Sequence, residues 1–176
     1  MPDELDRDVL DRFVRGDQDA FERLFRHFET DVHRWALRLV RDAGAAEDVV
    51  VEAFWGAYRG RARFDASRSF GAWMRRIATN VARDHLKKLP RPAAATAVDQ
   101  IRAPARDLDR DRAVSLAFRR LPPKLQVVAT LALIENAPYA EIADALDVPV
   151  GTVKSRVFRA VRALRKELAR LGIDHD

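Results

Sequence analysis

Apolar residues recur at intervals of three and four along most of this chain, which is the period of an amphipathic α-helix. The pattern is clearest between Pro138 and Leu168. A short segment there has apolar positions at Tyr139, Ile142, Ala143 and Leu146. A longer segment has them at Val153, Val157, Ala160, Val161, Leu164 and Leu168. Pro149 separates the two, since the residue before a proline is pushed out of the α region, and the arrangement predicts a helix-turn-helix.

The side of the longer helix that faces away from its apolar stripe is basic. At about 100° per residue, the positions gathered there are Thr152, Ser155, Arg159, Arg162 and Lys166. Lys154 and Arg165 flank one edge of the apolar stripe and Arg156 flanks the other. A solvated basic face is the ordinary explanation of such a pattern. This face, however, has no acidic residue and carries hydroxyl groups near the helix N-terminus, where recognition helices contact base edges, so we predict DNA binding.

Three more helical periods fill the first 58 residues. They run over about 3–15, from Asp17 or Asp19 to about Val40, and from Asp42 to about Tyr58. The middle one carries an aromatic and aliphatic stripe at Phe21, Leu24, Phe25, Phe28, Val32, Trp35, Ala36 and Leu39. Such a stripe at helical spacing is more typical of a core than of a ligand site.

The third helix has an outer face of unusual composition. Ala46, Val50, Ala53, Phe54 and Ala57 are predicted to point inward. The outer face then consists of Asp48, Glu52, Trp55 and Arg59, with Val51 at its edge. A tryptophan among acidic residues is costly to leave in water, which favours a protein partner; the alternative is that another segment of this chain covers it.

A fourth helix, over Phe70–Leu89, carries a second basic stripe. Its inward positions are predicted to be Phe70, Trp73, Ile77 and Val81. Beside them lie Arg76, Asn80, Arg83 and Lys87. Arginine and lysine suit phosphates and asparagine can contact a base edge, so we predict a second DNA contact. The preceding segment, Gly60–Ser69, breaks the helical period and is predicted to be a loop with Arg61, Arg63 and Arg68.

The stretch 90–112 changes character, with three prolines, an alanine run and mixed charges, and is predicted to be a linker that is flexible in its first half and helical toward its end. Helical periods resume after it, with inward positions at Val114, Ala117, Phe118, Leu121, Leu125, Val128 and Leu131. The fold class is therefore all-α: two small helical domains, 1–89 and 113–176, joined by a linker at 90–112.

Charge and composition narrow the function further. Residues 59–89 carry nine basic and two acidic side chains, and residues 149–176 carry seven and three, which indicates a polyanion contacted at two places. Cysteines are absent, no apolar run approaches the roughly 20 residues of a membrane span, and the acidic N-terminus is unlike a signal peptide. We expect a cytoplasmic protein without membrane insertion. No metal-ligand set, glycine-rich phosphate loop or activated nucleophile is recognisable, so we expect no cofactor and no enzymatic activity.

Three stretches resemble bacterial sigma-70 family factors of the extracytoplasmic-function (ECF) group. LPPKLQVVATLALIENAPYAEIADALDVPVGTVKSRVFRAVRALRKEL is similar to their C-terminal DNA-binding domain, and AEDVV and FGAWMRRIATNVARDHLKK resemble their N-terminal domain. The resemblance implies a factor that directs core RNA polymerase to promoters, contacts the β′ clamp helices and the β flap, and is controlled by an anti-sigma protein.

The same resemblance assigns roles to the candidate residues. Binding to the β′ clamp helices would fall to Asp48, Val51, Glu52 and Trp55, although the family usually has glutamine where this chain has Val51. Capture and opening of the −10 promoter element would fall to Arg61, Arg63, Arg76, Asn80, Arg83 and Lys87. Recognition of the −35 duplex would fall to Thr152, Lys154, Ser155, Arg156, Arg159 and Arg162.

Two other classes of binding protein are compatible with parts of the sequence. A helix-turn-helix repressor or activator of the LuxR type explains residues 122–168 but leaves Trp55, the stripe on 70–89 and the two-module layout without a use. An adaptor helical bundle predicts no DNA affinity, which the two basic stripes argue against.

Overall fold

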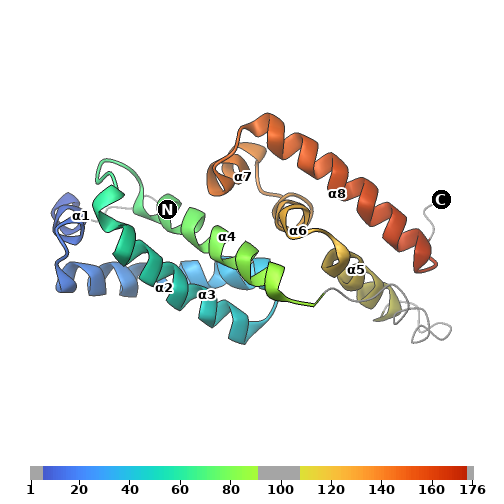
Figure 1. The fold of residues 1–176 in the computed structure, drawn as a ribbon, viewed down its shortest axis with the longest axis horizontal. Helices are drawn as coiled ribbons and strands as arrows, with labels where there is room; N and C mark the ends of the chain where they lie inside the picture. Colours follow the sequence, from blue (N-terminus) through green and yellow to red (C-terminus); the bar gives the residue numbers. More distant parts are fainter. Residues whose placement is uncertain (1–5, 91–107, 174–176) are drawn as a thin grey trace. The chain divides into compact units, whose positions relative to one another are not determined.

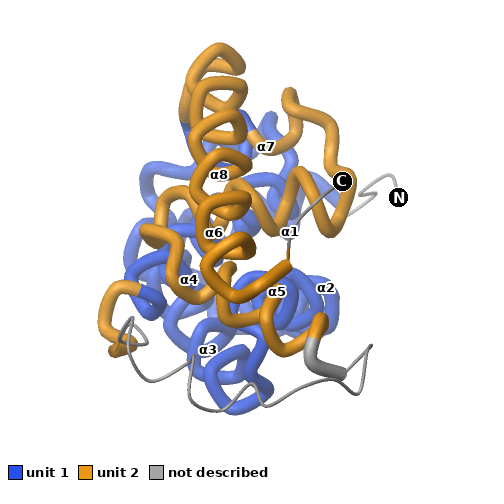
Figure 2. Tube along the Cα trace, turned by 90° about the vertical axis from the view of Figure 1, so that its right-hand side faces the viewer, with its two compact units in different colours: residues 1–86, 143–147 blue, residues 87–142, 148–176 orange. Residues whose placement is uncertain are grey.

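The computed structural model describes residues 6–90 and 108–173, and every regular element within those ranges is a helix (Figure 1). The all-α prediction is confirmed. The chain divides into two compact units, residues 1–86 with 143–147 and residues 87–142 with 148–176 (Figure 2). None of the described helices is long and apolar enough to cross a membrane.

Carboxylates begin the first helices of unit 1. Helix α1 (Arg7–Val14) is capped by Asp6, and helix α2 (Gln18–Val40) by Asp17, whose side chain accepts the Ala20 N–H at 2.9 Å. These side chains satisfy N–H groups that have no partner inside the helix. Gly16 joins the two helices with φ +90°, a conformation that side-chain-bearing residues rarely adopt.

Helices α2 and α3 (Ala43–Gly60) pack against each other (Figure 1). Asp42 caps α3 as predicted, since its carboxylate accepts the Ala45 N–H at 2.8 Å. The inward positions predicted for α3 are all buried. Ala46, Ala53 and Ala57 have no exposed surface, and their small side chains let the neighbouring helices approach closely.

Aromatic rings fill the core between α1, α2 and the start of α4 (Phe70–Lys88). Phe70 lies at the centre, with ring centroids 5.4 Å from Phe13, 5.1 Å from Phe28 and 5.5 Å from Phe64. Edge-to-face and tilted geometries of this kind add to the stabilisation that burial provides. The aromatic stripe predicted on α2 is thus part of the core.

The predicted inward face of α4 is wrong by part of a turn. Trp73, Ile77 and Val81 are only half-buried, whereas the fully buried positions run along Met74, Ala78, Thr79, Ala82 and the start residue Phe70. The largest apolar residues do not mark the centre of the interface because close helix packing selects small side chains there. Trp73 packs at the edge, with its ring 4.8 Å from that of Phe64.

Unit 2 includes α5 (Leu108–Arg120), so the last residues of the stretch 90–112 are helical. Helix α6 (Pro123–Ala129) comes next, with proline in its first turn, and continues into a π-helical turn, η2 (Thr130–Ile134), that the periodicity did not indicate. One core cluster joins Ala117, Phe118, Leu121, Ala129, Ala160 and Leu164. Val114 was expected inside but is 38% exposed. Most of the predicted linker, residues 91–107, lies outside the described residues.

The predicted break between two helices lies where expected. Helix α7 (Tyr139–Leu146) ends before Asp147, which has φ +54°, and α8 (Val150–Arg170) begins after Pro149. Ile142, Ala143 and Leu146 are buried as predicted, but Tyr139 is exposed. The short helix, turn and long helix of the sequence prediction are therefore all present in the backbone.

Candidate nucleic-acid interface

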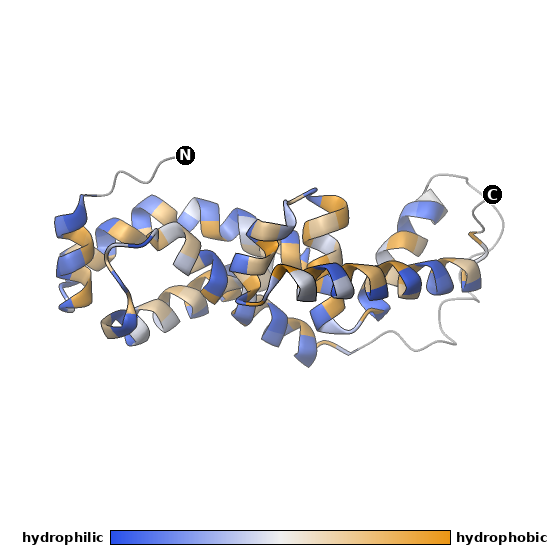
Figure 3. Cartoon of the chain, turned by 90° about the horizontal axis from the view of Figure 1, so that it is seen from above, coloured by the Kyte–Doolittle hydropathy of each residue, from blue (hydrophilic) through white to orange (hydrophobic). Residues whose placement is uncertain are grey.

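Helix α8 separates its apolar and basic side chains cleanly. The buried residues of this helix include Val153, Val157, Ala160 and Leu164. Of the predicted −35 residues, Lys154, Ser155, Arg159 and Arg162 are exposed, and Thr152 and Arg156 are half-buried. Figure 3 shows hydrophilic and hydrophobic residues alternating along the whole helix. All six residues predicted to bind the −35 element thus have side-chain surface available outside the core of α8.

Two local hydrogen bonds hold part of this basic face against the helix. Ser155 Oγ donates to the Thr152 carbonyl at 3.0 Å, and Arg159 Nε donates to the Ser155 carbonyl at 3.3 Å. An arginine fixed in this way can present two parallel N–H groups to a phosphate or a guanine edge.

Phe158 is a residue of this face that sequence reasoning missed. Its side chain is 64% exposed, and the Arg162 guanidinium lies over the ring, 5.9 Å from the centroid. At 100° per residue it falls between Arg162 and Arg165 on the polar side, so the helical period alone was a sufficient signal. An exposed aromatic ring among arginines can contact thymine methyl groups in a major groove.

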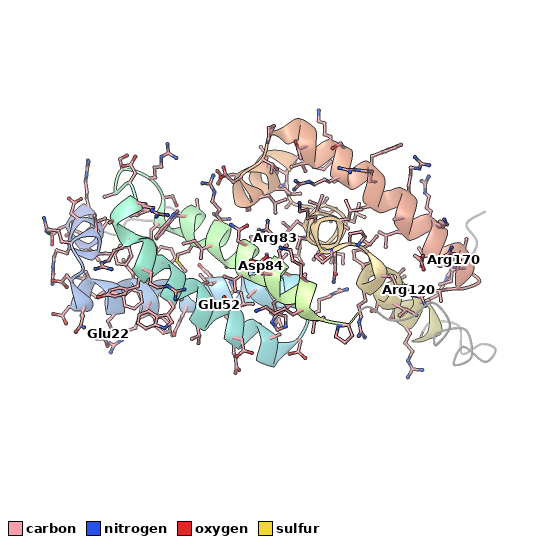
Figure 4. The ribbon with its side chains drawn as sticks, in the orientation of Figure 1. Glu22, Glu52, Arg83, Asp84, Arg120 and Arg170 are labelled. Atoms are coloured by element: carbon pink, nitrogen blue, oxygen red, sulfur yellow. The ribbon has the colours of Figure 1, made fainter. Side chains whose placement is uncertain are left out.

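The stripe on α4 is less exposed than the one on α8. Arg76, Asn80 and Arg83 are half-buried, and Lys87 near the C-terminal end is exposed. Arg83 and Asp84 lie side by side (Figure 4), with 3.7 Å between Arg83 Nε and Asp84 Oδ1. The four side chains occupy one side of the helix, as the sequence predicted. Arg76 is already engaged within unit 1, because its Nη2 donates to Asp147 Oδ1 at 2.7 Å.

The segment between α3 and α4 is more ordered than the predicted loop. It starts with a 3₁₀ turn, η1 (Arg61–Arg63), and the buried Phe64 comes directly after that turn. Asp65 Oδ1 then accepts hydrogen bonds from the Ser67 hydroxyl at 2.7 Å and from the Ser67 N–H at 2.9 Å, and both hold the pKa of the Asp65 carboxyl below its ordinary value. Ser69 Oγ accepts the Ala72 N–H at the start of α4.

The three arginines of this segment differ in their surroundings. Arg63 and Arg68 are exposed, and Arg68 Nε lies 3.6 Å from Asp65 Oδ2. Arg61 is half-buried, and its Nη1 donates to the Tyr58 carbonyl at 2.8 Å. The segment therefore consists of a 3₁₀ turn, a turn held by the Asp65 carboxylate and the Ser69 cap of α4. Only part of it is exposed.

The outer face of α3 is apolar at its centre and acidic around it. Trp55 is 56% exposed and Val51 is 64% exposed, and the flanking Asp48 and Glu52 are exposed as well (Figure 4 labels Glu52). Tyr58 lies beside Trp55, with 5.9 Å between ring centroids. The described residues of unit 1 leave the tryptophan more than half exposed, so that unit does not bury it.

The side chains on these surfaces are of the types that bind nucleic acid. Among the described residues, no group of three or more histidine, cysteine, aspartate or glutamate side chains is arranged to hold a metal ion. The groups gathered on α4 and α8 are guanidinium, ammonium, amide and hydroxyl groups, which are the usual partners of phosphates and base edges.

Comparison with known proteins assigns both units to one family. Residues 24–91 match sigma-70 region 2, and residues 111–164 match sigma-70 region 4. The RNA polymerase sigma-H factor of Pseudomonas aeruginosa is 35% identical over 96% of this chain and 96% of its own length. The ECF RNA polymerase sigma factor SigW of Bacillus subtilis is 34% identical over 88% of this chain and 91% of its own length.

A solved structure agrees with these relatives. CnrH, determined in complex with the cytosolic domain of CnrY, matches 93% of this chain and 97% of its own with a TM-score of 0.58 and 27% identity. The sequence relatives cover nearly the whole chain at more than 30% identity, and both family regions occur in the family's order. The chain therefore belongs to the sigma-70 family, within the ECF group of RNA polymerase sigma factors.

Proposed function

We propose that this chain performs the promoter-directing function of an ECF sigma factor through three separate surfaces: α8 for the −35 duplex, α4 with the preceding segment for the −10 element, and the outer face of α3 for core RNA polymerase. The observation that carries the proposal is the presence of two basic helical faces and one exposed acidic-apolar face in a chain that matches both sigma regions.

For the −35 element, the basic face of α8 enters the major groove. Thr152, Ser155 and Arg156 lie in the first two turns, where recognition helices contact base edges. Lys154, Arg159 and Arg162 provide cationic groups for phosphates or guanine edges, and Phe158 adds an apolar contact to a thymine methyl group. Direct readout of duplex sequence is therefore assigned to one face of one helix.

For the −10 element, the stripe on α4 supports the non-template strand while the segment before it receives unstacked bases. Arg76, Arg83 and Lys87 neutralise phosphates, and Asn80 contacts a base edge or the backbone. Opening requires no nucleotide hydrolysis, because a protein that binds exposed bases better than duplex shifts the base-pairing equilibrium toward the open form.

For polymerase, the exposed pair Val51 and Trp55 docks on the β′ clamp helices, with Asp48 and Glu52 completing the contact. An aromatic anchor surrounded by charged residues is typical of the centre of a protein interface. Val51 stands where the family usually has glutamine, so this chain offers apolar contact area there in place of an amide group.

The other partners are assigned on the same basis. Helices of region 4 contact the β flap, and an anti-sigma protein covers one or more of the three surfaces, in keeping with the CnrH structure and its CnrY partner. The protein works in the cytoplasm, where promoter DNA and polymerase are found, and acts as a transcription initiation factor rather than an enzyme.

The test is transcription in vitro with the purified chain, bacterial core RNA polymerase and a randomised promoter library, after which the transcripts are sequenced. We expect initiation that depends on the added chain and shared motifs near −35 and −10. Core polymerase alone is the control. Selective duplex binding by the chain without any initiation would overturn the proposal and favour a helix-turn-helix repressor or activator.

A further inference from the structure

Arg61 makes its contacts with the protein's own backbone and rings. Its Nη1 donates to the Tyr58 carbonyl at 2.8 Å, and its guanidinium carbon lies over the Tyr58 ring, 4.5 Å from the centroid. The residue comes directly after the last residue of α3, where unpaired carbonyls give the helix end a partial negative charge. The cation is therefore held by a carbonyl, a π face and a helix dipole at once.

The turn between α1 and α2 closes on the same guanidinium. A Cβ added at Gly16 would lie 3.1 Å from both Arg61 Nε and Nη2, which is tighter than ordinary contact. Gly16 also has φ +90°, which side-chain-bearing residues rarely adopt. The positive φ thus favours glycine at this turn, and a methyl group there would also press on the Arg61 guanidinium.

The backbone of Arg61 also fixes the position of Phe64. The Arg61 carbonyl accepts the Phe64 N–H at 3.0 Å, and Phe64 is buried against Phe70 and Trp73. Beyond Phe64 come the Asp65–Ser67 turn and the Ser69 cap of α4. Arg61 and Phe64 therefore anchor the start of the segment, whereas Arg63 and Arg68 extend from it into solvent.

We propose that Arg61 is a positioning residue for −10 recognition: it contacts no DNA, and instead holds the 3₁₀ turn at the start of the segment against Tyr58 and Gly16, which fixes where residues 65–69 begin and so where they receive an unstacked base. This inference rests on the −10 role proposed above for that segment. It separates two neighbouring arginines that the sequence treated alike, because Arg63 contacts phosphate and Arg61 sets the geometry.

Salt dependence distinguishes the two roles. Loss of one phosphate contact to single-stranded DNA lowers the slope of log affinity against log salt concentration by about 0.7, whereas loss of a positioning residue leaves the number of released counterions unchanged. The probe is a fluorescent non-template-strand oligonucleotide pool, randomised at six positions. It is bound by holoenzyme reconstituted from bacterial core polymerase and the full chain, and the bound fraction is sequenced.

We expect Arg61→Gln to keep the wild-type slope while its base preferences fall toward the even distribution of the starting pool. Gly16→Ala should do the same although it leaves the arginine charge in place, and Arg61→Lys should retain the slope with weakened preferences. Arg63→Ala is the matched control, for which we expect the slope to fall by about 0.7 with preferences kept. Circular dichroism checks that each variant is helical.

A slope reduced by about 0.7 in Arg61→Gln, with base preferences intact, would overturn the inference, because Arg61 would then be a phosphate contact. The inference would also be overturned if both Arg61→Gln and Arg61→Lys kept the base preferences of the wild type. These two variants are enough to decide the question if Gly16→Ala fails to fold. Absence of any base preference in the wild-type holoenzyme would instead overturn the −10 assignment of the segment, and this inference with it.

Discussion

Trp35 Nε1 donates a hydrogen bond to Thr79 Oγ1 at 2.9 Å, and this bond joins the C-terminal half of α2 to the middle of α4 inside unit 1. Thr79 is fully buried, and its hydroxyl donates in turn to the Arg75 carbonyl at 2.7 Å. The Arg75 guanidinium lies over the Trp35 ring, 5.8 Å from its centroid. Helix α4, to which we assign the −10 element, is thus fixed by this series of polar contacts as well as by apolar packing.

We expect Thr79→Val to lower the free energy of unfolding by about 1–3 kcal/mol, because the substitution conserves volume but leaves the buried indole N–H without an acceptor. Urea denaturation monitored by circular dichroism measures the change. Thr79→Ser keeps the hydroxyl and is the control for the loss of a methyl group. Equal stability of the valine variant and the wild type would show that the hydrogen bond contributes nothing net.

An ion pair ties the first helix of unit 2 to the end of α8. Arg120 Nη1 lies 2.9 Å from Glu167 Oε2, and Arg170 Nη1 lies 3.2 Å from Glu167 Oε1; Arg120 and Arg170 end α5 and α8 (Figure 4). Because the Arg120 side chain is only 9% exposed, Glu167→Gln should destabilise unit 2 by on the order of 3 kcal/mol. Calorimetry measures this loss of stability. The double variant Arg120→Met with Glu167→Leu should recover much of it, because no unpaired charge is then left buried. If the double variant recovers nothing, the loss does not come from breaking the ion pair.

Stability should fall in acid partly through Asp17. Its carboxylate accepts the Ala20 N–H and pairs with Arg12, and these contacts, in that order, hold the pKa of Asp17 below its ordinary value. A lowered folded-state pKa means that the stabilisation is complete above the unfolded pKa, which is near 3.8, and is lost as pH falls through the folded-state value. Asp17→Asn should flatten this part of the pH–stability curve; an unchanged curve would exclude Asp17 as its cause.

Trp55→Ala should weaken binding to core polymerase without altering the circular dichroism spectrum, because the side chain is exposed in the free protein. Removal of an aromatic interface anchor typically costs about 2 kcal/mol or more, or roughly thirtyfold in affinity. Fluorescence anisotropy with labelled protein measures the dissociation constant for core polymerase. The matched control is Leu37→Ala, which removes an exposed apolar side chain from α2 and should leave polymerase binding unchanged. Equal affinities of both variants would remove Trp55 from the interface.

Arg159→Ala should weaken binding to −35 duplex and reduce the slope of log affinity against log salt by about 0.9 if its guanidinium contacts phosphate. A nitrocellulose filter or anisotropy titration at several salt concentrations gives both quantities. Arg119→Ala removes another exposed arginine, this one from α5, and should leave the slope unchanged. A slope that falls equally in both variants would indicate a general charge effect and not a contact by α8.

The order of helices and much of their bounds could be predicted from the sequence, because period and caps are local properties. Asp17 and Asp42 marked helix starts, Pro149 marked the break before α8, and the basic face of α8 could be read from spacing alone. The family resemblance rested on the same local strings, and the comparisons confirmed it.

Which face of α4 is buried, and what surrounds Arg61, depended on tertiary structure. The centre of the buried face runs along Met74, Ala78 and Ala82 because closely packed helices exclude the larger Trp73 from the middle of the interface. The Arg61 guanidinium lies against Gly16, which is distant in the sequence, and against Tyr58, which is near in the sequence. Arg63 is exposed instead. A periodicity reports which side of a helix is apolar, but which neighbour fills the space beside each side chain is decided only when the elements pack.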